Sequence, residues 1–140
     1  MANIIYPPVY VSWETRGYWE GCGRGELVLQ RCRDCSTVQH KPRGVCATCL
    51  STGLEHFVAS GKGTVHTFTI TNQNLASPFA AACPYVLAYV ELAEGPRLLT
   101  HVMDCDPASV HIGMAVQVAF QVQERTDGEA FGVPYFVPAT

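Results

Sequence analysis

The second half of the chain alternates apolar and polar residues with the two-residue period that is typical of β-strands. We predict five strands there, at residues 63–71, 84–92, 97–103, 115–123 and 131–137. Residues 84–92 are apolar on both faces, as in a strand at the centre of a barrel. The turn Glu94-Gly95-Pro96 joins this strand to the next one in a hairpin. Together with a short turn or helix near residues 106–110, these strands favour a small Greek-key barrel of the OB type.

The same alternation predicts which side chains point into this barrel. One face of 63–71 consists of Val65, Thr67, Thr69 and Thr71, and the other of His66, Phe68 and Ile70. Along 115–123, the inward positions are Val116, Val118, Phe120 and Val122, and the outward positions are Gln117, Gln121 and Gln123. Pro134 has no N–H to donate, so we expect it to break the last strand and to place that strand at an edge or a barrel seam.

The first 26 residues are rich in aromatic residues and glycine. A short helix is predicted at 14–20, with Ser12 as its N-cap and the following glycines ending it. The aromatic residues are Tyr6, Tyr10, Trp13, Tyr18 and Trp19. Aromatic anchors are typical of protein interfaces, and packing on the chain's own barrel is the other explanation for each of them.

Four cysteines form two Cys-x-x-Cys pairs, Cys32 with Cys35 and Cys46 with Cys49, ten residues apart. Each pair is expected to form a tight turn that presents two thiolates on one side, and two facing turns complete a tetrahedral metal site. Four thiolates leave no position for water, which makes the site structural. Zinc accepts this arrangement and iron in a rubredoxin-like site uses the same ligands, so the spacing leaves both metals open. A redox role is disfavoured, because no βαβ pattern surrounds the pairs.

The other three cysteines, Cys22, Cys83 and Cys105, have no metal-ligand spacing. Cys105 lies between two aspartates, which would raise its pKa and weaken it as a nucleophile. Cys83 would form a catalytic dyad if the fold brought His66, His101 or His111 next to it, and plain packing in the barrel is the alternative. Phosphate-loop, dinucleotide-binding, serine-hydrolase and metalloprotease motifs are absent. We therefore predict no catalytic residue and assign no cofactor-binding residue.

Composition narrows the class of protein. The chain has 140 residues, of which 48% are hydrophobic and 15% charged. A run of about 18 apolar residues is absent, so we expect no transmembrane helix and no membrane partner. The first ten residues lack a basic stretch followed by an apolar one, so we do not expect a secretory signal. We expect a cytoplasmic location instead. An odd number of cysteines without such a signal favours metal or free thiols over disulfides.

Charge is distributed unevenly along the chain. The formal net charge of -3 argues against a nucleic-acid partner, whose protein is expected to be basic. The basic residues at positions 24–43 are Arg24, Arg31, Arg33, Lys41 and Arg43, and the acidic ones are Glu26 and Asp34. Residues 63–140 are acidic, with Arg97 and Arg125 against Glu91, Glu94, Asp104, Asp106, Glu124, Asp127 and Glu129. A single-stranded nucleic-acid-binding OB module therefore stays the weaker alternative.

The order of these features resembles the DUF35 family, OB-fold proteins with a rubredoxin-like zinc ribbon that are associated with acyl-CoA metabolism. The matching motifs are Trp19-Glu20-Gly21, Leu27 to Cys32, Lys41-Pro42-Arg43 with the second cysteine pair, Ser60 to Thr69, Pro84-Tyr85-Val86, Gly95 to Thr100 and Ile112-Gly113-Met114. Ser36 departs from the family, since many ribbons have glycine after the first pair. The resemblance implies a mainly β fold with an N-terminal helical segment (1–26), a zinc ribbon (27–56) and a five-stranded OB-fold barrel (57–140).

The resemblance also implies a function. Such a protein is expected to be a non-catalytic accessory subunit of an acyl-CoA-processing complex. It would bind and stabilise a thiolase-superfamily partner (a thiolase, retro-aldolase or acyltransferase) in a hetero-oligomer and help to form the acyl-CoA channel. A hotdog-fold enoyl-CoA hydratase is the alternative partner. Arg31, Arg33, Lys41 and Arg43 would then meet CoA phosphates or an acidic partner surface, and the other explanation is that they are solvated loop residues.

Overall fold

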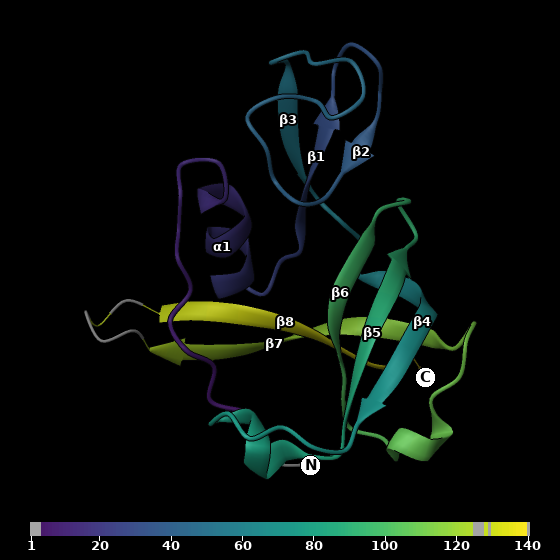
Figure 1. Cartoon of the computed structure of the whole chain (residues 1–140). Helices are drawn as coiled ribbons and strands as arrows, with labels where there is room; N and C mark the ends of the chain where they lie inside the picture. The colour runs from purple at the N-terminus through teal and green to yellow at the C-terminus, as the bar shows by residue number, and fades with distance from the viewer. Residues whose placement is uncertain (1–3, 125–127, 129, 140) are drawn as a thin grey trace.

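The computed structural model of the chain describes residues 4–124, 128 and 130–139. It contains a three-stranded sheet and a closed five-stranded barrel, with helix α1 (Arg16–Gly23) beside both (Figure 1). This mainly β architecture confirms the predicted fold class. Within the residues given above, no helix is long and apolar enough to cross a membrane.

The three-stranded sheet is antiparallel and carries both cysteine pairs. Its strands are β1 (Val28–Cys32), β2 (Val38–Gln39) and β3 (Leu54–Val58), in the order β2-β1-β3. The central strand β1 pairs with β3 along its whole length, from Val28 opposite Val58 to Cys32 opposite Leu54. Because β1 ends at Cys32, its pairing with β3 fixes where the first cysteine pair begins.

The barrel has the topology of an OB fold. Its strands are β4 (Lys62–Thr71), β5 (Tyr85–Leu92), β6 (Arg97–Val102), β7 (Ala115–Glu124) and β8 (Ala130–Pro138), closed in the order β4-β5-β6-β8-β7. All neighbours are antiparallel except β6 and β8, which run parallel where Val102 faces Phe136. Two 3-10 helices lie in the connections, η1 (Phe79–Ala82) and η2 (Pro107–Ser109). The second is the predicted short element near 106–110.

The barrel core consists of the inward side chains of all five strands. Its most buried members are Val65, Val86, Val90, Val102, Val116 and Phe136, each at most 1% exposed. Leu27, which directly precedes β1, and Leu29, which lies within β1, belong to the same cluster of buried residues. The sheet and the barrel are therefore joined by a shared hydrophobic core, which is the main favourable term in folding.

The faces of β4 differ from the prediction because this strand contains a bulge. The pairing shifts between Val65, which faces Val90, and Thr67, which faces Tyr89. An extra residue reverses the alternation of side chains beyond it. Phe68 and Ile70 consequently pack on the same core as Val65, and the predicted grouping of Val65 with the three threonines was wrong.

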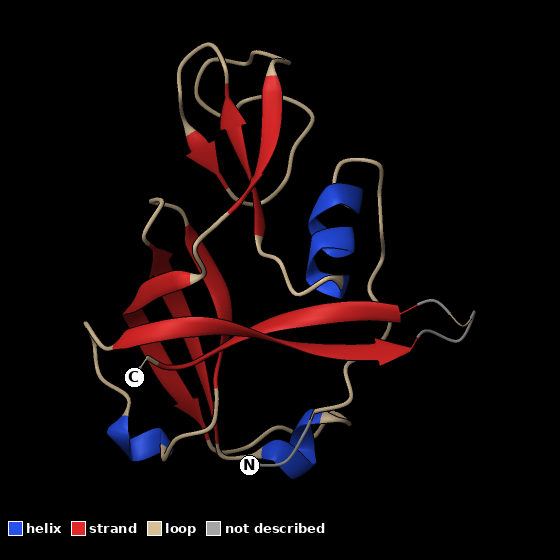
Figure 2. Ribbon diagram, turned by 180° about the vertical axis from the view of Figure 1, so that it is seen from behind, coloured by secondary structure: helices blue, strands red, loops and turns tan. Residues whose placement is uncertain are grey.

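The last two strands form a long twisted hairpin, part of which extends beyond the barrel core (Figure 2). Val122, expected to face inward, is 55% exposed because it lies on this outer part of β7. Pro134 does not break β8 and pairs with Phe120. Its other side faces β6, where the ladder is confined to Val102 and Phe136, so the missing N–H costs no bond there. The predicted position of β8 at the barrel seam is confirmed.

Helix α1 begins two residues later than predicted and ends at Gly23. Ser12 does not cap it. The Ser12 hydroxyl instead lies 3.1 Å from the Thr15 hydroxyl, in a turn that precedes the helix. The helix packs on β8 at Gly132, where an added Cβ would overlap the backbone carbonyl of Cys22. Only glycine permits this close approach of helix and strand.

We expect Gly132→Ala to destabilise the protein by about 2–3 kcal/mol, since overpacking a tight contact forces the backbones apart. Gly23→Ala is the matched control, because a Cβ at Gly23 meets no atom within 4 Å. The control is expected to change the free energy of unfolding by less than about 1 kcal/mol. Urea denaturation measures both, and an equal effect of the two substitutions would contradict the close-packing explanation.

Candidate metal centre

The two cysteine pairs meet at one end of the three-stranded sheet. Their four Sγ atoms all lie within 4.8 Å of one another. The Sγ atoms of Cys32 and Cys49 are 3.6 Å apart, and those of Cys35 and Cys46 are 3.5 Å apart. A tetrahedral site with metal–sulfur bonds of about 2.3 Å needs sulfurs about 3.8 Å apart. The donor set and its spacing therefore fit a four-thiolate metal ion with only small adjustment.

Both cysteine pairs are shaped by the same backbone turn. The N–H of Ser36 donates to the carbonyl of Cys32 at 2.9 Å, and the N–H of Leu50 donates to the carbonyl of Cys46 at 3.0 Å. Ser36 and Leu50 each have φ 65, in the left-handed region that favours glycine. Each cysteine pair is thus followed by a residue in the same strained backbone conformation. Ser36 adopts this conformation although it is not glycine.

Hydrogen bonds and neighbouring thiols shift the pKa values of Cys35 and Cys49 in opposite directions. The Thr37 hydroxyl, followed by its backbone N–H, lowers the pKa of Cys35 to about 6. The backbone N–H of Ser51 lowers the pKa of Cys49, but the neighbouring thiols, Cys32 first, outweigh this and raise it to about 12. Four sulfurs this close do not all ionise by themselves. A bound cation stabilises all four as thiolates and releases their protons.

Two buried glutamines hold the second cysteine pair in place, and the sequence analysis missed both. Gln30 and Gln39 are 4% and 7% exposed. The Gln30 side chain accepts from the N–H of Arg43 and donates to its carbonyl, both at 2.9 Å. Gln39 donates to Gln30 at 2.9 Å and accepts from the N–H of Ala47 at 2.9 Å. Gln30 directly follows the apolar residues Leu27, Val28 and Leu29. A polar residue in such an apolar strand is the sequence signal from which its buried role could have been predicted.

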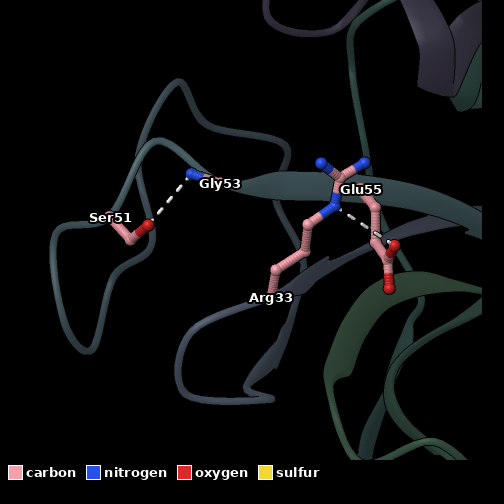
Figure 3. Close-up of polar contacts among 4 residues, drawn as sticks. All are labelled: Arg33, Ser51, Gly53 and Glu55. Carbon is pink, nitrogen blue, oxygen red and sulfur yellow. Dashed lines mark hydrogen bonds and ion pairs between the residues drawn. The ribbon is translucent and has the colours of Figure 1, made fainter.

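The basic residues around the metal site are partly neutralised within the chain. Arg33 pairs with Glu55 on β3 at 3.4 Å (Figure 3), and Arg24 pairs with Glu26 at 2.7 Å. Both ion pairs are exposed, so they contribute little stability. The guanidinium of Arg31 lies 4.2 Å from the centre of the Phe57 ring, a cation–π contact.

Lys41 and Arg43 differ from these three basic residues. Both are exposed, and neither forms an ion pair with any residue in the described part of the chain. Asp34 instead accepts from the Ser51 hydroxyl, which in turn accepts from the N–H of Gly53 at 3.0 Å (Figure 3). The unpaired positive charge near the metal site is therefore concentrated on the loop that precedes the second cysteine pair.

The structure does not assemble the Cys83 dyad. The Sγ of Cys83 lies 3.6 Å from the carbonyl of Phe79, and no histidine among the described residues hydrogen-bonds it. His101 bonds Tyr6 instead, and His111 bonds the carbonyl of Ser109. Cys22 is fully buried, and burial raises its pKa to about 12, so it is a packed thiol.

The N-terminal aromatic residues divide between the two explanations given for them. Tyr18 is buried, packs edge-on against Trp19, and lies on the core side of α1. Tyr10 and Trp13 are 87% and 74% exposed. Trp13 stands over Gly44, where its ring leaves no room for a side chain. It therefore packs on the loop of residues 40–45, at the glycine that follows Arg43 in the chain.

Comparison with known proteins matches both the three-stranded sheet and the barrel to family models. Residues 19–55 match the model of the ChsH2 rubredoxin-like zinc ribbon domain, and residues 58–121 match the model of the ChsH2 C-terminal OB-fold domain. A solved chain titled "Ltp2-ChsH2(DUF35) aldolase" is similar over 95% of this chain and 100% of its own length. Its TM-score is 0.81 and its identity is 30%.

Curated relatives of similar length have a scaffold name. A "DUF35 domain-containing scaffold protein" of Methanocaldococcus jannaschii is 36% identical over 78% of this chain and 77% of its own. Another of Methanothermobacter thermautotrophicus is 36% identical over 84% of this chain and 90% of its own. A longer relative, the "3-oxo-4,17-pregnadiene-20-carboxyl-CoA hydratase alpha subunit" of Mycobacterium tuberculosis, is 35% identical over 78% of this chain, which spans only 34% of that protein.

We expect Cys46→Ser to abolish stoichiometric metal binding, because three thiolates and a hydroxyl hold the ion far less tightly than four thiolates. Cys83→Ser, the control, is expected to keep the wild-type metal content. Elemental analysis of the purified proteins measures both. Full metal content in Cys46→Ser would exclude Cys46 as a ligand.

Replacing Gln39 by leucine is expected to weaken metal affinity by about 10- to 100-fold, as is typical when a group that supports metal ligands is lost. The control is Gln73→Leu, at an exposed position in the β4–β5 connection. A chelator competition assay compares the two affinities. If both variants matched the wild type, the second cysteine pair would not depend on the buried glutamines.

Proposed function

Since this chain belongs to the DUF35 family of proteins with a zinc ribbon and an OB-fold barrel, we propose that it is a non-catalytic accessory subunit of an acyl-CoA-processing complex. In this proposal it binds and stabilises a thiolase-superfamily enzyme in a cytoplasmic hetero-oligomer. The partner is a thiolase, a retro-aldolase or an acyltransferase, and the partner carries the catalytic residues. The observation that carries the proposal is the similarity to the full length of the solved chain titled "Ltp2-ChsH2(DUF35) aldolase".

Zinc is the metal that we propose for Cys32, Cys35, Cys46 and Cys49. An ion without geometric preference suits four thiolates, and the matched family model is that of a zinc ribbon. Four protein ligands leave no open position for substrate, so the ion has a structural role. Its contribution is to hold the loop of residues 40–45 between the two turns, and this loop carries the unpaired charges of Lys41 and Arg43.

The surface proposed for the partner combines this loop with the exposed aromatic residue above it. Trp13 is 74% exposed and packs over Gly44, the residue that follows Arg43 in the chain. Tryptophan and arginine are the residue types most enriched among interface residues that dominate binding energy. Arg43 and Lys41 suit an acidic partner surface or the phosphates of an acyl-CoA held at the interface.

A hotdog-fold enoyl-CoA hydratase is the second candidate partner. Two relatives are named as hydratase alpha subunits, those of Mycobacterium tuberculosis and Thermomonospora curvata. This chain spans 35% of the length of the Thermomonospora curvata protein. The relatives from Methanocaldococcus jannaschii and Methanothermobacter thermautotrophicus, in contrast, are named as scaffold proteins, which supports a scaffold role.

Affinity purification of the tagged chain from its native host is expected to co-purify a thiolase-superfamily enzyme. Trp13→Ala is expected to reduce the yield of this enzyme by about tenfold or more, because the substitution removes the aromatic anchor. Leu75→Ala is the control, because Leu75 is 87% exposed but lies in the β4–β5 connection. Its yield of partner should equal that of the wild type.

Different outcomes separate the alternatives. Co-purification of a hotdog-fold hydratase would favour the second candidate. Tight, salt-sensitive binding of single-stranded DNA by the purified chain, without a co-purifying enzyme, would overturn the proposal in favour of the nucleic-acid-binding module.

A further inference from the structure

A second feature of the molecule lies outside the surface proposed for the partner. The first described residues, Ile4 to Pro8, cross the barrel beside η1 and the outer part of β7 before the chain turns towards α1 (Figure 1). We call this segment the strap. Ile4 is 2% exposed, Ile5 is 73% exposed, and Tyr6 is half-buried. Alternate burial of this kind is how an extended peptide lies on a surface, with every second side chain inserted.

Two glutamines of β7 bind the backbone of the strap. The Gln123 side chain accepts from the N–H of Tyr6 at 3.0 Å and donates to the carbonyl of Tyr6 at 3.2 Å. Gln121 donates to the carbonyl of Ile4 and to the Gln123 side-chain oxygen. Bonds to an N–H and a carbonyl of the same residue are those that a neighbouring strand would make, and they do not depend on the side chains of the bound segment.

The Tyr6 side chain enters an aromatic pocket on the same wall. Its hydroxyl shares a 2.8 Å hydrogen bond with Nδ1 of His101 on β6. Its ring stacks on His101 at 6.0 Å between centres and meets Phe79 of η1 edge-on at 6.2 Å. Burial lowers the pKa of His101 and raises that of Tyr6 to about 12, so both groups are neutral near pH 7. This pocket supplies the side-chain selectivity that the glutamines lack.

Within the described residues, every hydrogen bond between the strap and the barrel involves a side chain. Across the part of the chain that the structure describes, no backbone–backbone hydrogen bond joins residues 4–8 to the barrel. The two barrel ladders nearest to it, β7 with β8 and β5 with β6, are complete without it. The strap can therefore leave without breaking the barrel. Its departure would expose the Gln121 and Gln123 side chains and the aromatic pocket to another extended segment.

We propose that this wall of the barrel is a binding groove for an extended peptide with an aliphatic residue two positions before a tyrosine, and that residues 4–8 of a second copy of this chain occupy it when the chain's own strap is displaced. The strap of a second copy has the same sequence, so it can make the contacts with the groove that the chain's own strap makes. The tether gives the internal strap an effective concentration in about the millimolar range, so it closes the groove in dilute protein. The second copy's strap enters at high protein concentration, and a strap-exchanged dimer results.

The test uses the full-length chain with Ile4→Ser and Tyr6→Ala, which disables its own strap. The probe is a fluorescently labelled synthetic peptide with the sequence of residues 2–9, followed by anisotropy. We expect it to bind the double variant at least about tenfold more tightly than the wild-type chain, whose own strap competes. A peptide with phenylalanine in place of tyrosine should bind about fivefold more weakly, as is typical for one lost hydrogen bond. Absence of binding to a folded double variant, or equal binding to both chains, would overturn the proposal.

Two further variants locate the peptide. Gln123→Ala in the double variant is expected to weaken peptide binding, whereas Gln117→Ala is expected to leave it unchanged. Gln117 lies on the same strand but bonds the carbonyl of Ser60, away from the strap. Equal effects of the two substitutions would show that the peptide binds elsewhere, and would overturn the proposed groove as its binding site.

The remaining measurements address folding and the second copy. If the double variant does not fold, Tyr6→Phe replaces it, and the peptide should then bind about fivefold more tightly than to the wild type. In sedimentation at about millimolar concentration, the wild-type chain should form dimers and a folded strap-disabled variant should not. A monomeric wild type, or equal dimerisation of both chains, would overturn the second copy as the occupant.

Discussion

Four cysteine sulfurs lie within 4.8 Å of one another, and the repulsion that would arise if all four ionised is the constraint on which the three-stranded sheet and its loops depend. The three-stranded sheet has only one strand with two neighbours, and the two turns after the cysteine pairs each contain a residue in a strained conformation. Such a unit buries too little apolar surface to order its loops by itself. A metal ion resolves the repulsion and ties both turns together. Metal binding and folding of this unit are consequently a single equilibrium.

Strand β1 transmits this constraint to the rest of the chain. Leu27, just before this strand, and Leu29, within it, belong to the core cluster shared with the barrel, and the strand's last residue, Cys32, belongs to the metal site. The N–H of Ala59 returns to the carbonyl of Leu27 at 2.8 Å, so the sheet leaves and re-enters the barrel at one point. Helix α1 braces this junction, because Gly21 permits contact with Val28 and Gly132 permits contact with Cys22. The position of the metal site relative to the barrel thus depends on close contacts at two glycines, where an added methyl group would overlap a neighbouring atom.

The predictable parts of this structure are those encoded by period and spacing. The cysteine pairs, the barrel strands and the seam at β8 follow from ligand spacing and the two-residue alternation. The bulge at His66 could not be predicted, since one extra residue leaves the local composition unchanged and is visible only in the register with β5. The roles of Gln121 and Gln123 were hidden for a related reason. Outward glutamines look solvent-facing until a segment more than a hundred residues away lies on them.

The N-terminal segment links the two surfaces that the molecule presents. Tyr6 anchors one end of it in a neutral, aromatic pocket of the barrel, and Trp13 stands at its other end over Gly44, beside the charged loop. Only a short stretch that includes Pro7 and Pro8 separates these anchors, and proline restricts the backbone conformations available to it. The position of the strap in its groove therefore restricts where Trp13 can lie against the loop of residues 40–45. A segment that leaves the groove removes one of the two supports of that tryptophan, so occupancy of the barrel wall and the geometry of the proposed partner surface are coupled through the same few residues.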